Sequence, residues 1–132
     1  DGISMHFPAV NVTKGISIIR AYKAIKDMVS FLHDKKKMNK NQYRFALTYG
    51  NDTIVTKFGN TQHEELISIG HAVNVAHKLE KEVKRGGYYI GMDNQCKPII
   101  EREWKSENYH PVYMPKALCR SENGIEFWYG VK

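Results

Sequence analysis

The sequence predicts an α+β fold, in which helices pack on one mostly antiparallel sheet, and three observations support this prediction. Several short runs alternate apolar and polar residues with the period of a strand, and two longer segments repeat apolar residues with the period of a helix. The 132 residues, 42% hydrophobic and 26% charged, fit one globular domain spanning residues 1–132. No apolar run approaches the roughly 18 residues of a membrane span, so we expect no membrane partner.

The N-terminal third predicts a strand over residues 3–7 and a helix over residues 15–36. The alternation of Ile-Ser-Met-His-Phe indicates the strand. The helix is indicated by an apolar stripe at helical spacing, consisting of Ile18, Tyr22, Ile25, Val29 and Leu32. A polar loop over residues 35–41 follows. Because the chain opens on Asp1-Gly2, a turn pattern without an initiator Met, we expect further residues upstream of Asp1.

The middle of the chain predicts three strands. Residues 43–49 and 53–58 are separated by Gly50-Asn51, a turn pattern, and are therefore expected to pair as a hairpin that ends at Gly59-Asn60. Residues 65–69 form a further short strand candidate. A helix over residues 71–84 follows, with a buried stripe of Ala72, Val75, Ala76, Leu79 and Val83.

The C-terminal third predicts a strand, a short helix and a hairpin. Gly86-Gly87 ends the second long helix, with Lys84 and Arg85 in its last turn. A strand is expected over residues 88–91 and a short helix within 93–107. Residues 109–120 and 125–131 are expected to pair as a hairpin that turns at Asn123-Gly124. The predicted order of the main elements is β-α-β-β-α-β-β-β, which is typical of α+β proteins.

Charge and cysteine content narrow the function classes. Twenty Lys and Arg against 14 Asp and Glu give a formal charge of +6, which favours an anionic partner such as a nucleic acid, a nucleotide or an acidic lipid. Cys96 and Cys119 form no CxxC pair, so the sequence offers no zinc or redox motif of that type. We expect a reduced pair of cysteines in a cytoplasmic protein.

The most informative stretch runs over residues 67–80, where a β-rich run ends at Gly70 and a helix begins. His71, Asn74 and Lys78 are spaced by three and four residues, which places them on one stripe opposite the apolar one. Asn is a poor helix former, so an Asn inside a helix needs a reason. The simplest interpretation is that these side chains are only solvated.

The pattern of the same stretch indicates a second interpretation. Gly-x-x-Val-Asn-x-Ala-x-Lys-Leu-Glu, over residues 70–80, resembles the signature of class III nucleotidyl cyclases, the catalytic domains of adenylate and guanylate cyclases. Residues 1–7 resemble the Gly-Asp-Gly hairpin of that family, and residues 43–59 resemble a second family hairpin, in the same order along the chain. The resemblance extends to about Asp93.

The resemblance implies a ferredoxin-like βαββαβ fold with a C-terminal hairpin, and head-to-tail homodimers with sites at the interface. It implies conversion of a nucleoside triphosphate to a 3′,5′-cyclic monophosphate and pyrophosphate, with two Mg²⁺ or Mn²⁺ ions per site. A metal lowers the pKa of the ribose hydroxyl, and a nearby cation stabilises charge on the phosphates.

Individual residues match family positions. Asp1 matches a metal-binding Asp, Asn74 the Asn that orients the ribose, and Lys78 stands where an Arg usually stabilises the transition state. Ile67 occupies the position that reads the base, within a substrate-binding stretch that includes Gly70 and His71, and Lys116 is a candidate phosphate ligand in the last hairpin.

The departures from the family pattern leave alternatives open. The first strand and helices of the family, with the other metal-binding Asp, would precede Asp1. Lys keeps the charge of Arg but loses its bidentate geometry. This change favours either a slower enzyme or a catalytically degenerate domain that serves dimerisation or nucleotide binding. Ile67 cannot hydrogen-bond a base, so a relaxed purine cyclase and an anti-phage (Pycsar) uridylate or cytidylate cyclase are both open. A basic RNA-binding module with stacking aromatics is a third alternative, although the expected partner is a nucleotide rather than a nucleic acid.

Overall fold

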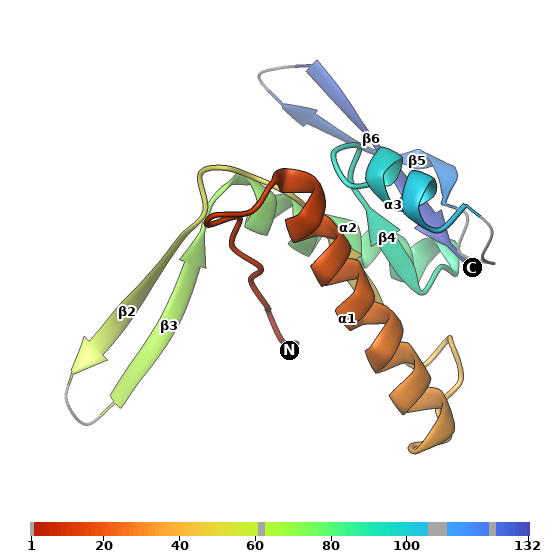
Figure 1. Cartoon of the computed structure of the whole chain (residues 1–132), viewed down its shortest axis with the longest axis horizontal. Helices are drawn as coiled ribbons and strands as arrows, with labels where there is room; N and C mark the ends of the chain where they lie inside the picture. The colour runs from red at the N-terminus through yellow and green to blue at the C-terminus, as the bar shows by residue number, and fades with distance from the viewer. Residues whose placement is uncertain (1, 61–62, 106–110, 122–123) are drawn as a thin grey trace.

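The computed structural model describes residues 2–60, 63–105, 111–121 and 124–132 (Figure 1). At residues 54–60, 63–67, 112–121 and 124–126 it describes the backbone alone. The elements follow the order α-β-β-β-α-β-α-β-β along the chain. The expected α+β class, with helices on a mostly antiparallel sheet, is confirmed.

The central sheet has four strands in the order β1-β4-β6-β5. The edge strand β1 (Phe45–Leu47) pairs in parallel with β4 (Ile90–Met92). The other two pairs are antiparallel: β4 with β6 (Gly124–Val131), and β6 with β5 (Val112–Ser121). The pairing of β5 with β6 confirms the predicted final hairpin, whose turn position Asn123 lies outside the described residues.

Two helices cover one face of this sheet. The long helix α1 (Lys14–Asp34) begins at Thr13, whose hydroxyl accepts a hydrogen bond from the amide of Ile16 at 3.2 Å. Four of the five residues in its predicted stripe are buried, and the fifth, Leu32, is half-buried. The short helix α3 (Lys97–Glu103) lies against α1, and Tyr22 of α1 packs edge-on against Trp104 just beyond α3. The largest buried cluster lies between these helices and the sheet.

Helix α2 (His71–Gly86) packs on the opposite face. Its buried residues Val75, Leu79 and Val83 contact Trp128 of β6, with Ala46 and Tyr88 packed alongside. Phe45 and Leu47, which flank Ala46 in β1, pack in the larger cluster beneath α1 instead. This follows because successive side chains of a strand point to opposite faces of the sheet. A Cβ at Gly91 would lie 2.2 Å from Val83 Cγ2, so the glycine allows α2 to approach β4 closely.

The strands β2 (Ile54–Asn60) and β3 (His63–Ile69) form a separate antiparallel hairpin. Its register runs from the pair Ile54 and Ile69 to the pair Asn60 and His63. The hairpin projects away from the sheet and the helices (Figure 1). A lone two-stranded hairpin is marginally stable in water, and this one shares no strand with the central sheet.

The predicted hairpin of residues 43–58 is wrong. Strand β1 pairs with β4, and β2 pairs with β3 instead. Gly50 suggested a tight turn, but a Cβ there would lie 2.7 Å from the Cβ of Ala72. The glycine therefore serves the close approach of this connection to α2.

The predicted strand over residues 3–7 is also wrong. These residues form no regular element, and Ile3 and Met5 are exposed. Alternation indicates only that a segment could be a strand, whereas a strand also needs a partner that accepts its backbone hydrogen bonds. No described strand pairs with this segment, which is held instead by side chains. The hydroxyl of Ser17 on α1 donates to the carbonyl of Phe7.

Candidate functional site

The end of β3 and the first turn of α2 form one continuous stretch that contacts two other segments of the chain. The connection after β1 contacts it, because the hydroxyl of Thr48 donates to the carbonyl of Ala72 at 2.7 Å. Strand β3 runs directly into α2 at Gly70. The N-terminal segment reaches β3, because a ring nitrogen of His6 lies 2.8 Å from the hydroxyl oxygen of Ser68. These are the three segments that carry the resemblance described above.

Gly70 and Asp52 fix how α2 begins. Gly70 has φ +150°, and a Cβ there would lie 2.9 Å from Thr53 Cα, so a side chain at this position is excluded both by conformation and by space. The carboxylate of Asp52 accepts from the His71 amide at 3.3 Å and 3.4 Å to its two oxygens. A carboxylate at a helix N-terminus is favourable because the unpaired amides carry partial positive charge.

The predicted polar stripe of α2 is confirmed as an exposed face. His71, Asn74 and Lys78 are all exposed, whereas Ala72, Val75, Leu79 and Val83 are buried. The Asn74 amide donates to the carbonyl of Gly70 at 3.1 Å, so the Asn74 backbone belongs to the regular helix and its side chain leaves the helix toward solvent. An amide and an ammonium group therefore stand one turn apart on an open surface.

Three predicted site residues cannot be placed in this arrangement. Asp1 lies outside the described residues. Ile67 belongs to β3, where its backbone pairs with Thr56, and Lys116 belongs to β5, in the stretch between Tyr113 and Leu118 where the register shifts. The side chains of Ile67 and Lys116 lie outside the description, so their roles as base-reading and phosphate-binding residues stay predictions.

The described residues do not fit a metal centre on their own. Within that part of the chain, no three His, Cys, Asp or Glu side chains are gathered closely enough to bind a metal ion. The Asp52 carboxylate accepts from the first amide of α2, and the Asp93 carboxylate accepts from three backbone amides. No metal-dependent step follows from these side chains.

Asp93 and Cys96 form a buried polar group that the sequence did not single out, and its role is structural. The Asp93 carboxylate accepts from three backbone amides, those of Tyr49, Gln95 and Cys96, at 2.9 to 3.1 Å. It thereby ties the connection after β1 to the start of α3. Burial, and secondarily the Asp93 carboxylate, raise the pKa of the Cys96 thiol well above its usual range. Cys96 is free and uncharged, as expected of a reduced core cysteine.

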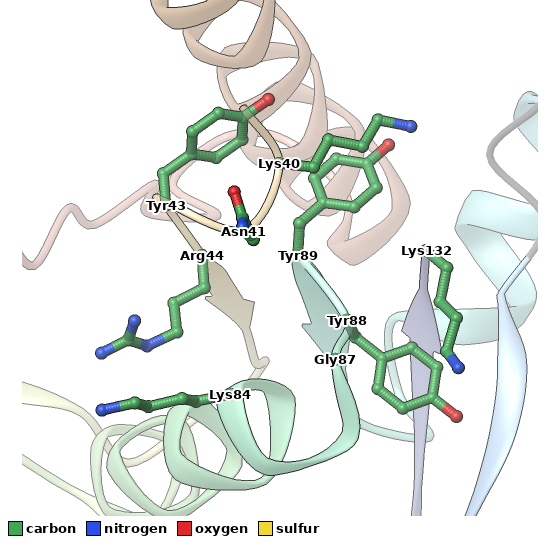
Figure 2. Close-up of a pocket in the computed structure, with 9 residues that line it drawn as sticks. All are labelled: Lys40, Asn41, Tyr43, Arg44, Lys84, Gly87, Tyr88, Tyr89 and Lys132. Atoms are coloured by element: carbon green, nitrogen blue, oxygen red, sulfur yellow. The ribbon is translucent and has the colours of Figure 1, made fainter. Parts of the chain in front are cut away.

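A second group that sequence analysis missed lies at the other end of α2. A pocket there is lined by four cationic side chains, from Lys40, Arg44, Lys84 and Lys132, together with tyrosines (Figure 2). These residues come from three segments spread over more than ninety positions, so no linear motif contains them. Only the run of basic residues at 78–85 could have indicated one part of it.

Comparisons with known proteins give a similarity to solved structures alone. No protein-family model matches the chain, and no curated protein matches it. Among solved structures, the chain is similar to a bacterial light-regulated adenylyl cyclase, with 18% sequence identity and a TM-score of 0.49. The similarity covers 89% of this chain and 33% of the other, so the chain spans about a third of the length of that protein. In the part of the chain that the structure describes, none of the helices has the length and apolar character needed to cross a membrane.

Proposed function

We propose that the chain is a nucleotidyl cyclase domain that converts a nucleoside triphosphate to a 3′,5′-cyclic monophosphate and pyrophosphate. One observation carries this proposal. The two other segments that resemble the cyclase family contact the stretch over residues 67–80, one at Ser68 and one at Ala72, and His71, Asn74 and Lys78 of this stretch form an exposed polar stripe. Segments that only happened to resemble the family would have no reason to meet at one place.

The proposed reaction assigns one task to each of two side chains. The ribose 3′-hydroxyl releases its proton to solvent and its oxygen attacks the α-phosphorus, the bond from that phosphorus to the bridging oxygen breaks, and pyrophosphate leaves with the electron pair. The Asn74 amide orients the ribose through hydrogen bonds, which lowers the entropic barrier. The Lys78 ammonium stabilises the negative charge that develops on the phosphates. The expected two Mg²⁺ or Mn²⁺ ions stay a prediction, to which the described side chains contribute no site.

A homodimer completes the proposed site. Asn74 and Lys78 stand on an open face, so a substrate held there needs further walls. A second copy of the chain supplies them in the arrangement that the resemblance implies, with Asn74 and Lys78 of one copy facing Asp1 of the other. The projecting β2–β3 hairpin offers free strand edges for such an association.

The base preference of the proposed enzyme depends on Ile67. An aliphatic side chain gives no hydrogen bond to a base edge, so discrimination between bases relies on shape. We propose a cyclase that accepts a pyrimidine, as a cyclic UMP or cyclic CMP producer in anti-phage signalling does. A relaxed purine cyclase is the alternative outcome of the same experiment.

The test uses the full-length protein with ATP, GTP, CTP and UTP in separate reactions containing Mn²⁺, with cyclic products detected by mass spectrometry. We expect a cyclic pyrimidine product from the wild-type protein and none from the Asn74→Ala variant. Asn94→Ala is the matched control, because Asn94 is also exposed but lies beside α3. A cyclic purine product would retain the cyclase and reject the pyrimidine assignment.

The absence of any cyclic product from a folded wild-type dimer would reject the proposed cyclase activity. Nucleotide binding that persists in that case would identify a degenerate domain, for which Lys78 in place of Arg is the sequence indication. Full activity of Asn74→Ala would reject the assignment of this stripe as the active site, even with a cyclic product present.

A further inference from the structure

The pocket at the C-terminal end of α2 has a volume of about 210 Å³. We name it the basic pocket and define it by its four cations, Lys40, Arg44, Lys84 and Lys132. Its walls come from the loop before β1, the end of α2 with the residues between α2 and β4, and Lys132 just after β6 (Figure 2). Asn74 lies ten residues from Lys84, about 15 Å along the helix axis, so the pocket is separate from the polar stripe.

The charges of the basic pocket are only partly compensated. No Asp or Glu lines it, and Glu80, one turn before Lys84 on α2, forms an ion pair with Arg44. Two cations lie over aromatic rings instead of carboxylates: Lys40 over Tyr89 at 4.7 Å and Lys132 over Tyr88 at 5.0 Å from the ring centres. Among the described residues, Lys84 forms no ion pair, and Figure 2 shows it extending alongside Arg44.

Three consecutive backbone amides of the pocket, at residues 87–89, are already paired, so a ligand on this wall would be bound by side chains. The amides of Gly87 and Tyr88 donate to the carbonyls of Lys84 and Val83, and these bonds end α2. The amide of Tyr89 donates to the carbonyl of Val131. The side-chain donors that we assign to the ligand are the ammonium and guanidinium groups and the Asn41 amide. All of them can bind phosphate oxygens.

Charge and size together select the ligand class. Four cations less the Glu80 carboxylate leave a net charge of +3 (4 − 1) around the pocket. A phosphoryl group carries about −1.5 to −2 at neutral pH, so two phosphoryl groups match this charge. A volume of about 210 Å³ lies below the roughly 300 Å³ at which pockets for drug-sized ligands begin. The two tyrosine faces that could stack a base are covered by Lys40 and Lys132.

We propose that the basic pocket binds a diphosphate group, either free pyrophosphate or the diphosphate of a nucleotide whose base stays outside. This site is independent of the proposed cyclase activity, because it shares no residue with the polar stripe and needs no turnover. The Lys84 ammonium also lies near the C-terminal end of α2, where the helix dipole stabilises a positive charge. A role limited to the helix would not involve Lys40 or Lys132, which come from other elements.

The test is a nuclear magnetic resonance titration of the ¹⁵N-labelled protein with pyrophosphate in the presence of EDTA, which prevents metal-assisted binding at the proposed active site. We expect saturable amide shifts at Asn41, Gly87 and Tyr88, and none at Asn74 or Lys78. Lys84→Gln should weaken binding about tenfold, the order expected for one charge-assisted contact. Lys84→Arg should restore it, and Lys40→Gln should weaken it similarly.

Lys23→Gln is the matched control, because Lys23 is exposed on α1 and lies outside the pocket. Shifts that spread over all lysines, or equal weakening by Lys23→Gln and Lys84→Gln, would overturn the proposal. Parallel titrations with ADP and UDP identify the source: tighter binding than pyrophosphate indicates a nucleotide, and weaker binding indicates the free anion. A single-stranded oligoribonucleotide that shifts the pocket amides when pyrophosphate does not would also overturn the proposal.

Discussion

The two ends of helix α2 differ in how their functional residues are assembled. At the start of the helix, the candidate groups His71, Asn74 and Lys78 lie within eight consecutive positions on one exposed stripe. At its end, the basic pocket collects four cations from three separate segments. A site built from one helix leaves a motif in the sequence, whereas a site built from separate loops can be recognised only once the fold is known.

Both ends rest on the same buried face of α2, so the largest expected effect is loss of this common support. Leu79 is fully buried, and truncating it leaves a cavity against β4 and Trp128. Leu79→Ala should lower the free energy of unfolding by about 3 kcal/mol. Chemical denaturation measures the loss, and Leu32→Ala, at a half-buried position of α1, should cost clearly less. Equal costs would mean that α2 is not the better-packed support.

The next effect separates the two ends. Asn74→Ala should reduce formation of cyclic product by about 100-fold or more, because the ribose is no longer oriented. The same variant should leave pyrophosphate binding at the basic pocket unchanged. Steady-state assays and the titration above measure the two properties. A variant that lost both would indicate that the ends of α2 act as one site.

A substitution at Gly70 tests the start of α2 alone. Gly70→Ala should destabilise the protein by about 1 to 3 kcal/mol, since a Cβ at φ +150° meets the backbone of Thr53. Gly15→Ala is the control of opposite sign. Its Cβ would make only an ordinary contact, 3.8 Å from Thr13 Oγ1, so helix α1 should gain roughly 0.5 to 1 kcal/mol. Thermal unfolding of both variants distinguishes these outcomes.

The smallest expected effect concerns the Asp52 carboxylate at the same helix start. Asp52→Ala should cost about 0.5 to 1 kcal/mol, because the His71 amide loses its acceptor. The neighbouring exposed residue supplies the control, and Asn51→Ala should change the stability little. A full loss of stability in Asp52→Ala would show that this contact does more than complete the helix start.

The helices could be predicted from the sequence because each carries its own burial pattern. The stripe of α1 around Tyr22 and the stripe of α2 around Leu79 are buried as expected, except that Leu32 and Ala76 are half-buried, and Gly87, with φ +73°, ends α2 where the Gly86-Gly87 pair indicated. Such patterns are local, because the period of the helix alone decides which residues face the core.

The strand pairing could not be predicted, because pairing depends on partners that are distant in the sequence. Strand β1 pairs with β4, which lies more than forty residues away. Consecutive strands pair more often, so the next strand along the chain was the expected partner. Gly50 has the residue type of a turn but serves a close contact with Ala72. The candidate residues divide in the same way: Asn74 and Lys78 were singled out because their continuous stretch resembles a family signature, whereas Lys40 and Lys132 belong to no such stretch.

In the proposed dimer, the Asn74 amide of one copy orients a substrate that is bound at Asp1 of the other copy. A mixing experiment with two inactive full-length variants, Asp1→Ala and Asn74→Ala, tests it most directly. Each variant alone should form no cyclic product. An equal mixture should recover roughly a quarter of wild-type activity, because half of the dimers are mixed and each of those has one intact site. A mixture that stays inactive, although exchange between the dimers is verified, would contradict a site shared by two copies.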